Sequence, residues 1–133
     1  MRELRWYGKV LSKELTEAKI IVISDLHYGN PYCSLKHFQR TLDFIKNNDN
    51  VYGFLNGDLM EAILKTSLGD IHEQELSPKK QRKDITEILM PIKDKILGMT
   101  TGNHEQRITN LTSDDPSELI AEDLNIPYRP EGM

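Results

Sequence analysis

The sequence predicts an α/β fold in which a mostly parallel sheet is flanked by helices. Three short apolar runs have the length and composition of strands, and they cover Ile20–Ile23, Val51–Leu55 and Ile96–Thr100. Between these runs lie stretches with the apolar spacing of helices, and a polar motif follows each run directly. Strands that alternate with helices are typical of parallel sheets built from right-handed crossover units.

The first crossover unit spans residues 20–55. Its strand, Ile20–Ile23, is β-branched throughout, which predicts burial on both faces of the sheet. A loop at 28–33 leads to Ser34, a suitable N-cap for a helix that the polar residues 47–50 terminate. The apolar stripe of that helix consists of Leu35, Phe38, Leu42 and Ile45. Upstream of the unit, Leu4–Val10 predicts a short strand.

The second crossover unit is less regular. Leu59–Leu64 predicts the beginning of a helix, and residues 67–76 predict a loop. Ser77 followed by Pro78 is a strong helix start, because proline is favoured at the first helical position. Pro91 is expected to kink or shorten that helix. After the third strand, Asp115-Pro116-Ser117 starts a last short helix that runs to Leu124.

The composition indicates one domain over residues 1–133, with 38% hydrophobic and 29% charged residues. The net charge of −4 argues against a broad basic groove for nucleic acid, although bound metal ions can supply positive charge locally. Cys33 is the single cysteine, which excludes an intramolecular disulfide. No apolar stretch approaches the ~20 residues of a membrane span, and no signal peptide is evident, so we expect a cytoplasmic location without membrane contact.

The first predicted strand is followed by a carboxylate and an imidazole. Asp25 and His27 stand two residues apart, so on an extended segment their side chains project to the same side. This ligand pair suits Mn, Fe or Zn better than Mg or Ca. Taken alone, the pair is better explained by a carboxylate that ends a strand and a histidine in a loop, because such short motifs often occur by chance.

The second and third strands end in comparable motifs. Asp58 can bridge two metal ions about 3.5–4 Å apart, and Gly57 before it allows a close backbone approach. Asn103 offers an amide oxygen, and His104 can direct an imidazole at a substrate oxygen. A helix-capping aspartate and a turn-forming Gly-Asn pair are the alternative explanations. The order of the three motifs, each at a strand end, favours one shared site.

These motifs, Asp25-x-His27, Gly57-Asp58 and Gly102-Asn103-His104-Glu105, resemble the first three signatures of the calcineurin-like metallophosphoesterases. The resemblance runs from about Ile20 to Arg107, and the charged N-terminal lead-in is also similar to that of bacterial and phage members. The family fold is an αββα sandwich with metal ions at the carboxyl edge of its two sheets. The resemblance thus implies the N-terminal half of such a sandwich, with the second sheet largely missing.

The resemblance also implies a set of metal ligands. Asp25 and His27 would bind a first ion, Asp58 would bridge to a second, and Asn103 would bind that second ion. The implied cofactors are two divalent metal ions, with Mn, Fe or Zn preferred. The implied reaction is hydrolysis of a phosphate mono- or diester by a hydroxide that the two ions activate.

Two further residues take catalytic roles by the same resemblance. His104 would stabilise the phosphoryl group and protonate the leaving alkoxide as a general acid. Glu61 stands where the family has an acid that orients this histidine, although the family residue is the shorter aspartate. Ala62 replaces the arginine of the Ser/Thr protein phosphatases, which disfavours that branch.

The histidine inventory departs from the family pattern. The family adds a lone His and a Gly-His-x-His motif from its second half, whereas this chain has four histidines and none after His104. His37 lies on a predicted helix and is expected to be solvated, and His72 is expected to be a surface residue in the loop. We therefore expect an apparently truncated domain that is poorly active alone.

Two other functions stay open beside that of an enzyme. The chain could be a catalytically incompetent metal-binding fragment, or an interaction subunit whose partner supplies the missing histidine ligands. In the latter case, a second copy or another chain would cover the exposed face of the sheet. The substrate is equally open among phosphate mono- and diesters, including nucleotides and nucleic acids. The loops at 28–33 and 67–76 contain no basic cluster that would select a polyanion.

Overall fold

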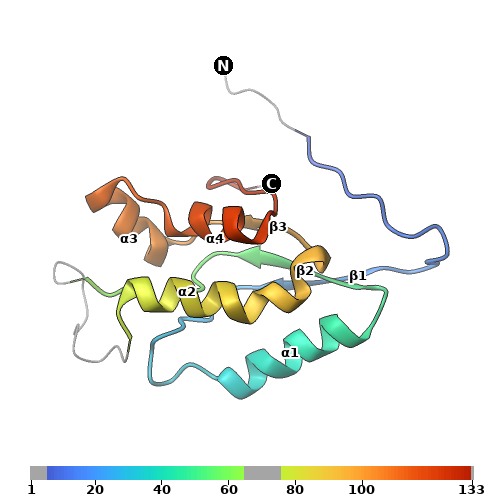
Figure 1. Cartoon of the computed structure of the whole chain (residues 1–133), viewed down its shortest axis with the longest axis horizontal. Coiled ribbons are helices and arrows are strands. Elements are labelled where there is room, and N and C mark those ends of the chain that lie inside the picture. Colours follow the sequence, from blue (N-terminus) through green and yellow to red (C-terminus); the bar gives the residue numbers. More distant parts are fainter. Residues whose placement is uncertain (1–5, 65–75, 133) are drawn as a thin grey trace.

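A computed structural model describes residues 6–64 and 76–132 of the chain (Figure 1). The elements are, in order, β1 (Lys19–Ile23), α1 (Leu35–Asn47), β2 (Val51–Asn56), α2 (Pro78–Leu89), the 3-10 helix η2 (Met90–Lys95), β3 (Ile96–Thr100), α3 (Asn103–Thr112) and α4 (Pro116–Leu124). The predicted fold class is confirmed, because the three strands form a parallel sheet flanked by helices.

The sheet has the strand order β1-β2-β3, with β2 at its centre. The register pairs Ile23 with Leu55 and Asn56 with Thr100, so the three strands end at nearly the same level. Since all three strands run in the same direction, the residues that follow them are gathered at one edge. This carboxyl edge is where open parallel sheets bind their ligands.

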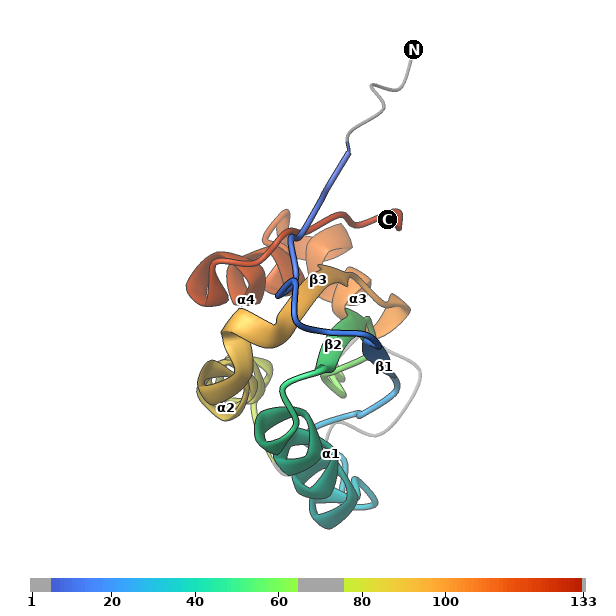
Figure 2. The same ribbon diagram turned by 90° about the vertical axis from the view of Figure 1, so that its right-hand side faces the viewer.

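One face of the sheet carries the hydrophobic core (Figure 2). Helices α1, α2 and α4 lie on this side of the strands and bury their apolar stripes against β2 and β3. The fully buried side chains include Ile45 from α1, Leu55 from β2, Leu89 from α2 and Leu124 from α4. Because these residues come from separate elements, the core joins the sheet to the layer of helices that covers this face.

The opposite face of β1 is open. Ile20 and Val22 are 60% and 61% exposed, and no helix or strand within the described residues covers them. The prediction that Ile20–Ile23 is buried on both faces was therefore wrong for these two side chains. A β-branched run reports strand propensity and does not reveal whether a second layer covers both faces. The expectation that one side of the sheet is exposed is thus met at β1, whereas Phe54 of β2 and Leu97 of β3 are half-buried.

Several local predictions can be compared with the structure. Ser77 caps α2 by accepting a hydrogen bond from the Lys80 N–H at 3.3 Å, and the α-helix gives way to η2 around Pro91, as predicted. Ser34 does occupy the N-cap of α1, but its side chain makes no capping hydrogen bond. The α4 helix begins at Pro116 as expected, with Asp115 as its cap.

Three predictions differ from the structure. The part of Leu4–Val10 that is described, residues 6–10, forms no strand. Residues 59–64 are extended and irregular instead of helical, because their backbone groups bond to neighbouring segments. The α3 helix was not predicted, since Gly102-Asn103 is turn-prone and carries no helix-start signal. The predicted loop at 67–76 falls outside the described residues except for Leu76, and His72 lies outside them as well.

Candidate active site

The segments that follow β1 and β2 run side by side at the carboxyl edge. The backbone N–H of His27 donates to the Asp58 carbonyl at 3.1 Å, and that of Tyr28 donates to the Leu59 carbonyl at 2.8 Å. The Glu61 N–H donates back to the Tyr28 carbonyl at 3.0 Å. Parallel pairing therefore continues beyond the strands and brings the first two motifs into contact.

Left-handed backbone conformations are concentrated in these two segments. The φ angles are 53° at Asp25, 50° at His27, 50° at Asp58 and 49° at Ala62. Side-chain-bearing residues adopt this region at a cost of about 1–3 kcal/mol, and such residues cluster at functional sites. Three of the four non-glycine residues in this conformation here are predicted metal ligands. The strain therefore supports a functional role for this edge.

Two glycines let the ends of β2 and β3 approach each other. A Cβ on Gly57, whose φ is 71°, would lie 2.6 Å from the backbone of Thr101 and Gly102. A Cβ on Gly102 would lie 2.2 Å from the Asp58 nitrogen. The close approach expected for Gly57 is thus present, and Gly102 contributes to it from the opposite side.

Glu105 fastens the second motif to α3. Its side chain is fully buried and accepts from the Asp58 N–H at 3.1 Å and the Met60 N–H at 2.9 Å. Burial raises the pKa of this carboxyl group, and the hydrogen bonds from these backbone groups oppose the rise. Sequence reasoning gave Glu105 no role, because an acid in the first turn of a helix is informative only once the helix is known.

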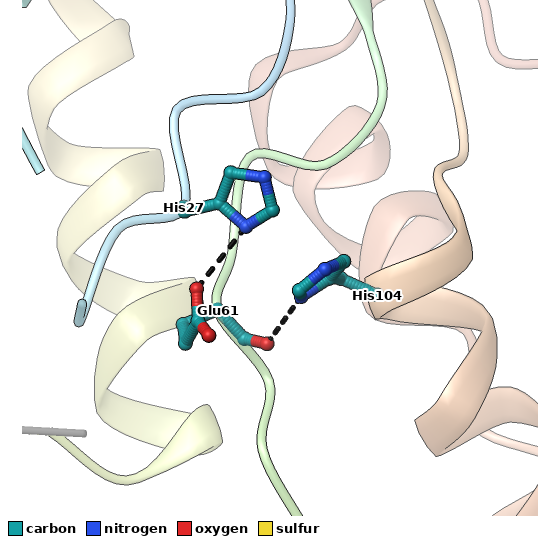
Figure 3. Close-up of side chains that lie close together, drawn as sticks. All are labelled: His27, Glu61 and His104. Atoms are coloured by element: carbon teal, nitrogen blue, oxygen red, sulfur yellow. Dashed lines mark hydrogen bonds and ion pairs between the residues drawn. The ribbon is translucent and has the colours of Figure 1, made fainter. Parts of the chain in front are cut away.

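Two imidazoles meet around Glu61 (Figure 3). His27 Nδ1 lies 3.1 Å from Glu61 Oε2, and His104 Nδ1 lies 2.6 Å from the Glu61 backbone oxygen. The rings are nearly perpendicular, with centroids 4.3 Å apart. Carboxylate and carbonyl oxygens only accept hydrogen bonds, so each Nδ1 carries the hydrogen. In each neutral ring Nε2 is therefore the nitrogen that carries the lone pair, and the Nε2 of His104 lies 3.4 Å from Arg107 Nη2.

Glu61 thereby contacts two histidines through two different groups, and not His104 alone. The resemblance implies that its carboxylate orients His104, but in the structure the carboxylate contacts His27 and the backbone carbonyl contacts His104. Glutamate is longer than the aspartate of the family signature, which gives its carboxylate the reach to a different ring. Glu61 itself is buried, and both contacts are partly buried.

The donor set fits a divalent metal ion. His27 Nε2 lies 3.9 Å from Asp25 Oδ1, and two ligands that are each about 2.1 Å from one ion can be up to ~4.2 Å apart. The ligand atoms of His27, Glu61 and His104 also lie within 4.8 Å of one another. That second group would have to contract slightly to share one ion, whereas the Asp25–His27 pair already has a suitable separation.

Asp58 connects this cluster to the start of α3. Its Oδ1 accepts from the backbone N–H of His104 at 2.9 Å, so it acts as a capping acceptor for that helix. The predicted residues Asp25, His27, Asp58, Glu61 and His104 are therefore joined by a continuous series of contacts. Asn103 is exposed as the first residue of α3, next to His104. His37 is exposed on α1, as expected.

The sequence profile of the calcineurin-like phosphoesterases matches residues 18–130. The chain belongs to this family. The match covers β1 and every later element described above, so the predicted family is confirmed. No curated protein and no solved structure gave a match. Among the residues described, no helix is long and apolar enough to span a membrane.

Replacing Glu61 in this phosphoesterase domain should weaken metal binding. Glu61→Ala removes the acceptor of the His27 Nδ1–H but retains the backbone carbonyl that holds His104. Loss of a group that orients a metal ligand typically costs about 10- to 100-fold in affinity. Calorimetric titration with Mn²⁺ should show a loss of this size, and Glu87→Ala on α2 serves as a control. Equal affinity in wild type and Glu61→Ala would contradict this role.

Proposed function

We propose that the chain is a metal-dependent phosphoesterase that hydrolyses a phosphate mono- or diester. The observation that carries the proposal is the position of His27 Nε2, 3.9 Å from Asp25 Oδ1, in a calcineurin-like phosphoesterase domain. Asp25 and His27 would hold one divalent ion, while Asp58 and Asn103 would complete a two-ion site of Mn, Fe or Zn. Such ions would activate water and neutralise charge on the phosphoryl oxygens.

His104 is the proposed general acid. In its protonated form, Nδ1–H is already engaged by the Glu61 carbonyl, so the transferable proton is the one on Nε2. This proton passes to the leaving alkoxide oxygen as the ester bond breaks, and the ring returns to its neutral form. The carbonyl stabilises the cationic ring before the transfer and fixes its orientation throughout.

Hydrolysis of aryl phosphate esters tests this proposal. We expect turnover of an aryl phosphomonoester or phosphodiester with Mn²⁺, loss with a chelator and recovery when Mn²⁺ is returned. His104→Gln should lower kcat by about 10²- to 10⁴-fold, as expected for loss of a general acid, without abolishing metal binding. His37→Gln, on the exposed surface of α1, is the matched control and should leave kcat unchanged. Turnover that is independent of metal would overturn the proposal.

The open face of β1 favours a second candidate function. Ile20 and Val22 are apolar and more than half exposed, as expected of a surface that another layer covers. In this alternative, the chain is an interaction subunit, and a second copy or another chain supplies further histidine ligands. Specific activity that rises with protein concentration would favour this arrangement, whereas constant specific activity would favour an independently acting chain.

A further inference from the structure

Arg107 is a cation in the candidate site that the proposed mechanism does not use. It lies one helical turn after His104 on α3, and its Nη2 is 3.4 Å from His104 Nε2. The side chain is half-buried. In the described part of the chain, no carboxylate forms an ion pair with it, whereas Arg82 pairs with Asp123 and Lys80 pairs with Asp84.

The position of the hydrogen on the His104 ring determines which of the two side chains is the donor in this contact. Nδ1 donates to the Glu61 carbonyl, so the neutral ring has only Nε2 available as an acceptor. The guanidinium group must therefore be the donor to Nε2, and 3.4 Å is long for such a bond. One of its five N–H groups is thus held weakly, and a stronger acceptor nearby can replace the ring nitrogen.

The charges in the site favour binding of an anion beside Arg107 and disfavour it next to the carboxylates. The carboxylates of Asp25 and Glu61 lie beside the His27 ring, and that of Asp58 accepts from the His104 N–H. An oxyanion next to these carboxylates would be repelled without metal ions. Arg107 is the basic side chain in contact with His104. A planar guanidinium can donate two parallel hydrogen bonds to phosphate oxygens, which a lysine ammonium cannot do.

We infer that Arg107 binds the phosphate group of the substrate, donating to one or two of its non-bridging oxygens in place of His104 Nε2. The inference rests on the proposed function, because it assigns a substrate contact within the same site. The ligand class that follows is a compact oxyanion bound beside His104, while the carboxylates of the site bind the metal ions. Release of Nε2 from Arg107 would leave this nitrogen facing the bound phosphate ester.

Orthophosphate binding tests the inference without requiring turnover. Calorimetric titrations of the Mn²⁺-loaded and the metal-free chain should show about tenfold weaker phosphate binding in Arg107→Gln than in wild type. Arg107→Lys should lose less, because it keeps the charge but not the planar fork. Arg82→Gln on α2 is the matched control and should bind phosphate as wild type does. Circular dichroism and thermal melting check that each variant is folded.

The outcomes separate this inference from the proposed function. If the chain binds Mn²⁺ but its phosphate affinity is the same in wild type and Arg107→Gln, or is absent in both, Arg107 is not the phosphate ligand and the metal site stands. If phosphate binding depends on Arg107 while Mn²⁺ does not bind, the anion site stands and the phosphoesterase proposal fails. An equal loss in Arg107→Gln and Arg82→Gln would reduce the effect to net charge and overturn the inference.

Discussion

Asp58→Asn is expected to lower Mn²⁺-dependent ester hydrolysis by more than about a hundredfold. Removing a group that only orients a metal ligand costs about 10- to 100-fold, so losing a bridging carboxylate should exceed that range. Asparagine removes the negative charge and one of the two metal-binding oxygens. It retains Oδ1, which can still accept from the His104 N–H, so the start of α3 should stay in place.

This retained hydrogen bond makes the measurement specific for the metal site. Mn²⁺ affinity from calorimetry and kcat from aryl ester hydrolysis should both fall, while the melting temperature changes little. Asp43→Asn is the matched control, because this carboxylate lies on the exposed side of α1 and accepts from Gln39 at 2.9 Å. Wild-type turnover by Asp58→Asn would exclude Asp58 as a bridging ligand.

Gly102→Ala should damage both the fold and the site. The new methyl group would lie 2.2 Å from the Asp58 nitrogen and 2.3 Å from Asp58 Oδ1, so the ends of β2 and β3 must separate. Overpacking of this kind costs about 1–3 kcal/mol in the free energy of unfolding. The displacement also moves Asp58 away from the His104 N–H, so we expect Mn²⁺ binding to weaken in the same variant.

Denaturant unfolding, combined with the Mn²⁺ titration, checks this prediction. Gly8→Ala provides the control, because a Cβ at that position meets nothing within 4 Å. Neither glycine has a positive φ, so the comparison isolates the effect of space from that of backbone strain. Unchanged stability in Gly102→Ala would mean that the two strand ends are not in close contact.

The sequence was sufficient to predict the sheet and the positions of the candidate site residues. Strand ends can be located because apolar runs stop where polar motifs begin, and parallel strands bring such ends to one edge. What could not be predicted was which side chains contact each other at this edge. Whether the Glu61 carboxylate faces His27 or His104 depends on side-chain length and on left-handed φ angles, which no pattern in a single sequence reports.

The α3 helix and residues 59–64 illustrate the same limit in the backbone. Gly102-Asn103 has the composition of a turn, yet the helix begins there because Asp58, from a distant segment, supplies its capping acceptor. Residues 59–64 have helix-forming side chains, but Met60 donates to Glu105 and Ala62 donates to Gln81. In both places, tertiary hydrogen bonds outweigh local propensity.

The buried carboxylate of Glu105 makes two of the three motifs inseparable in any attempt to alter this protein. Its bonds to the Asp58 and Met60 amides tie the exit of β2 to the first turn of α3, although the residues are 47 and 45 positions apart in the chain. An insertion, a deletion or a segment exchange at either place would displace the hydrogen-bond partner that the other place requires. The second and third motifs would have to be transplanted together, with their positions relative to each other preserved.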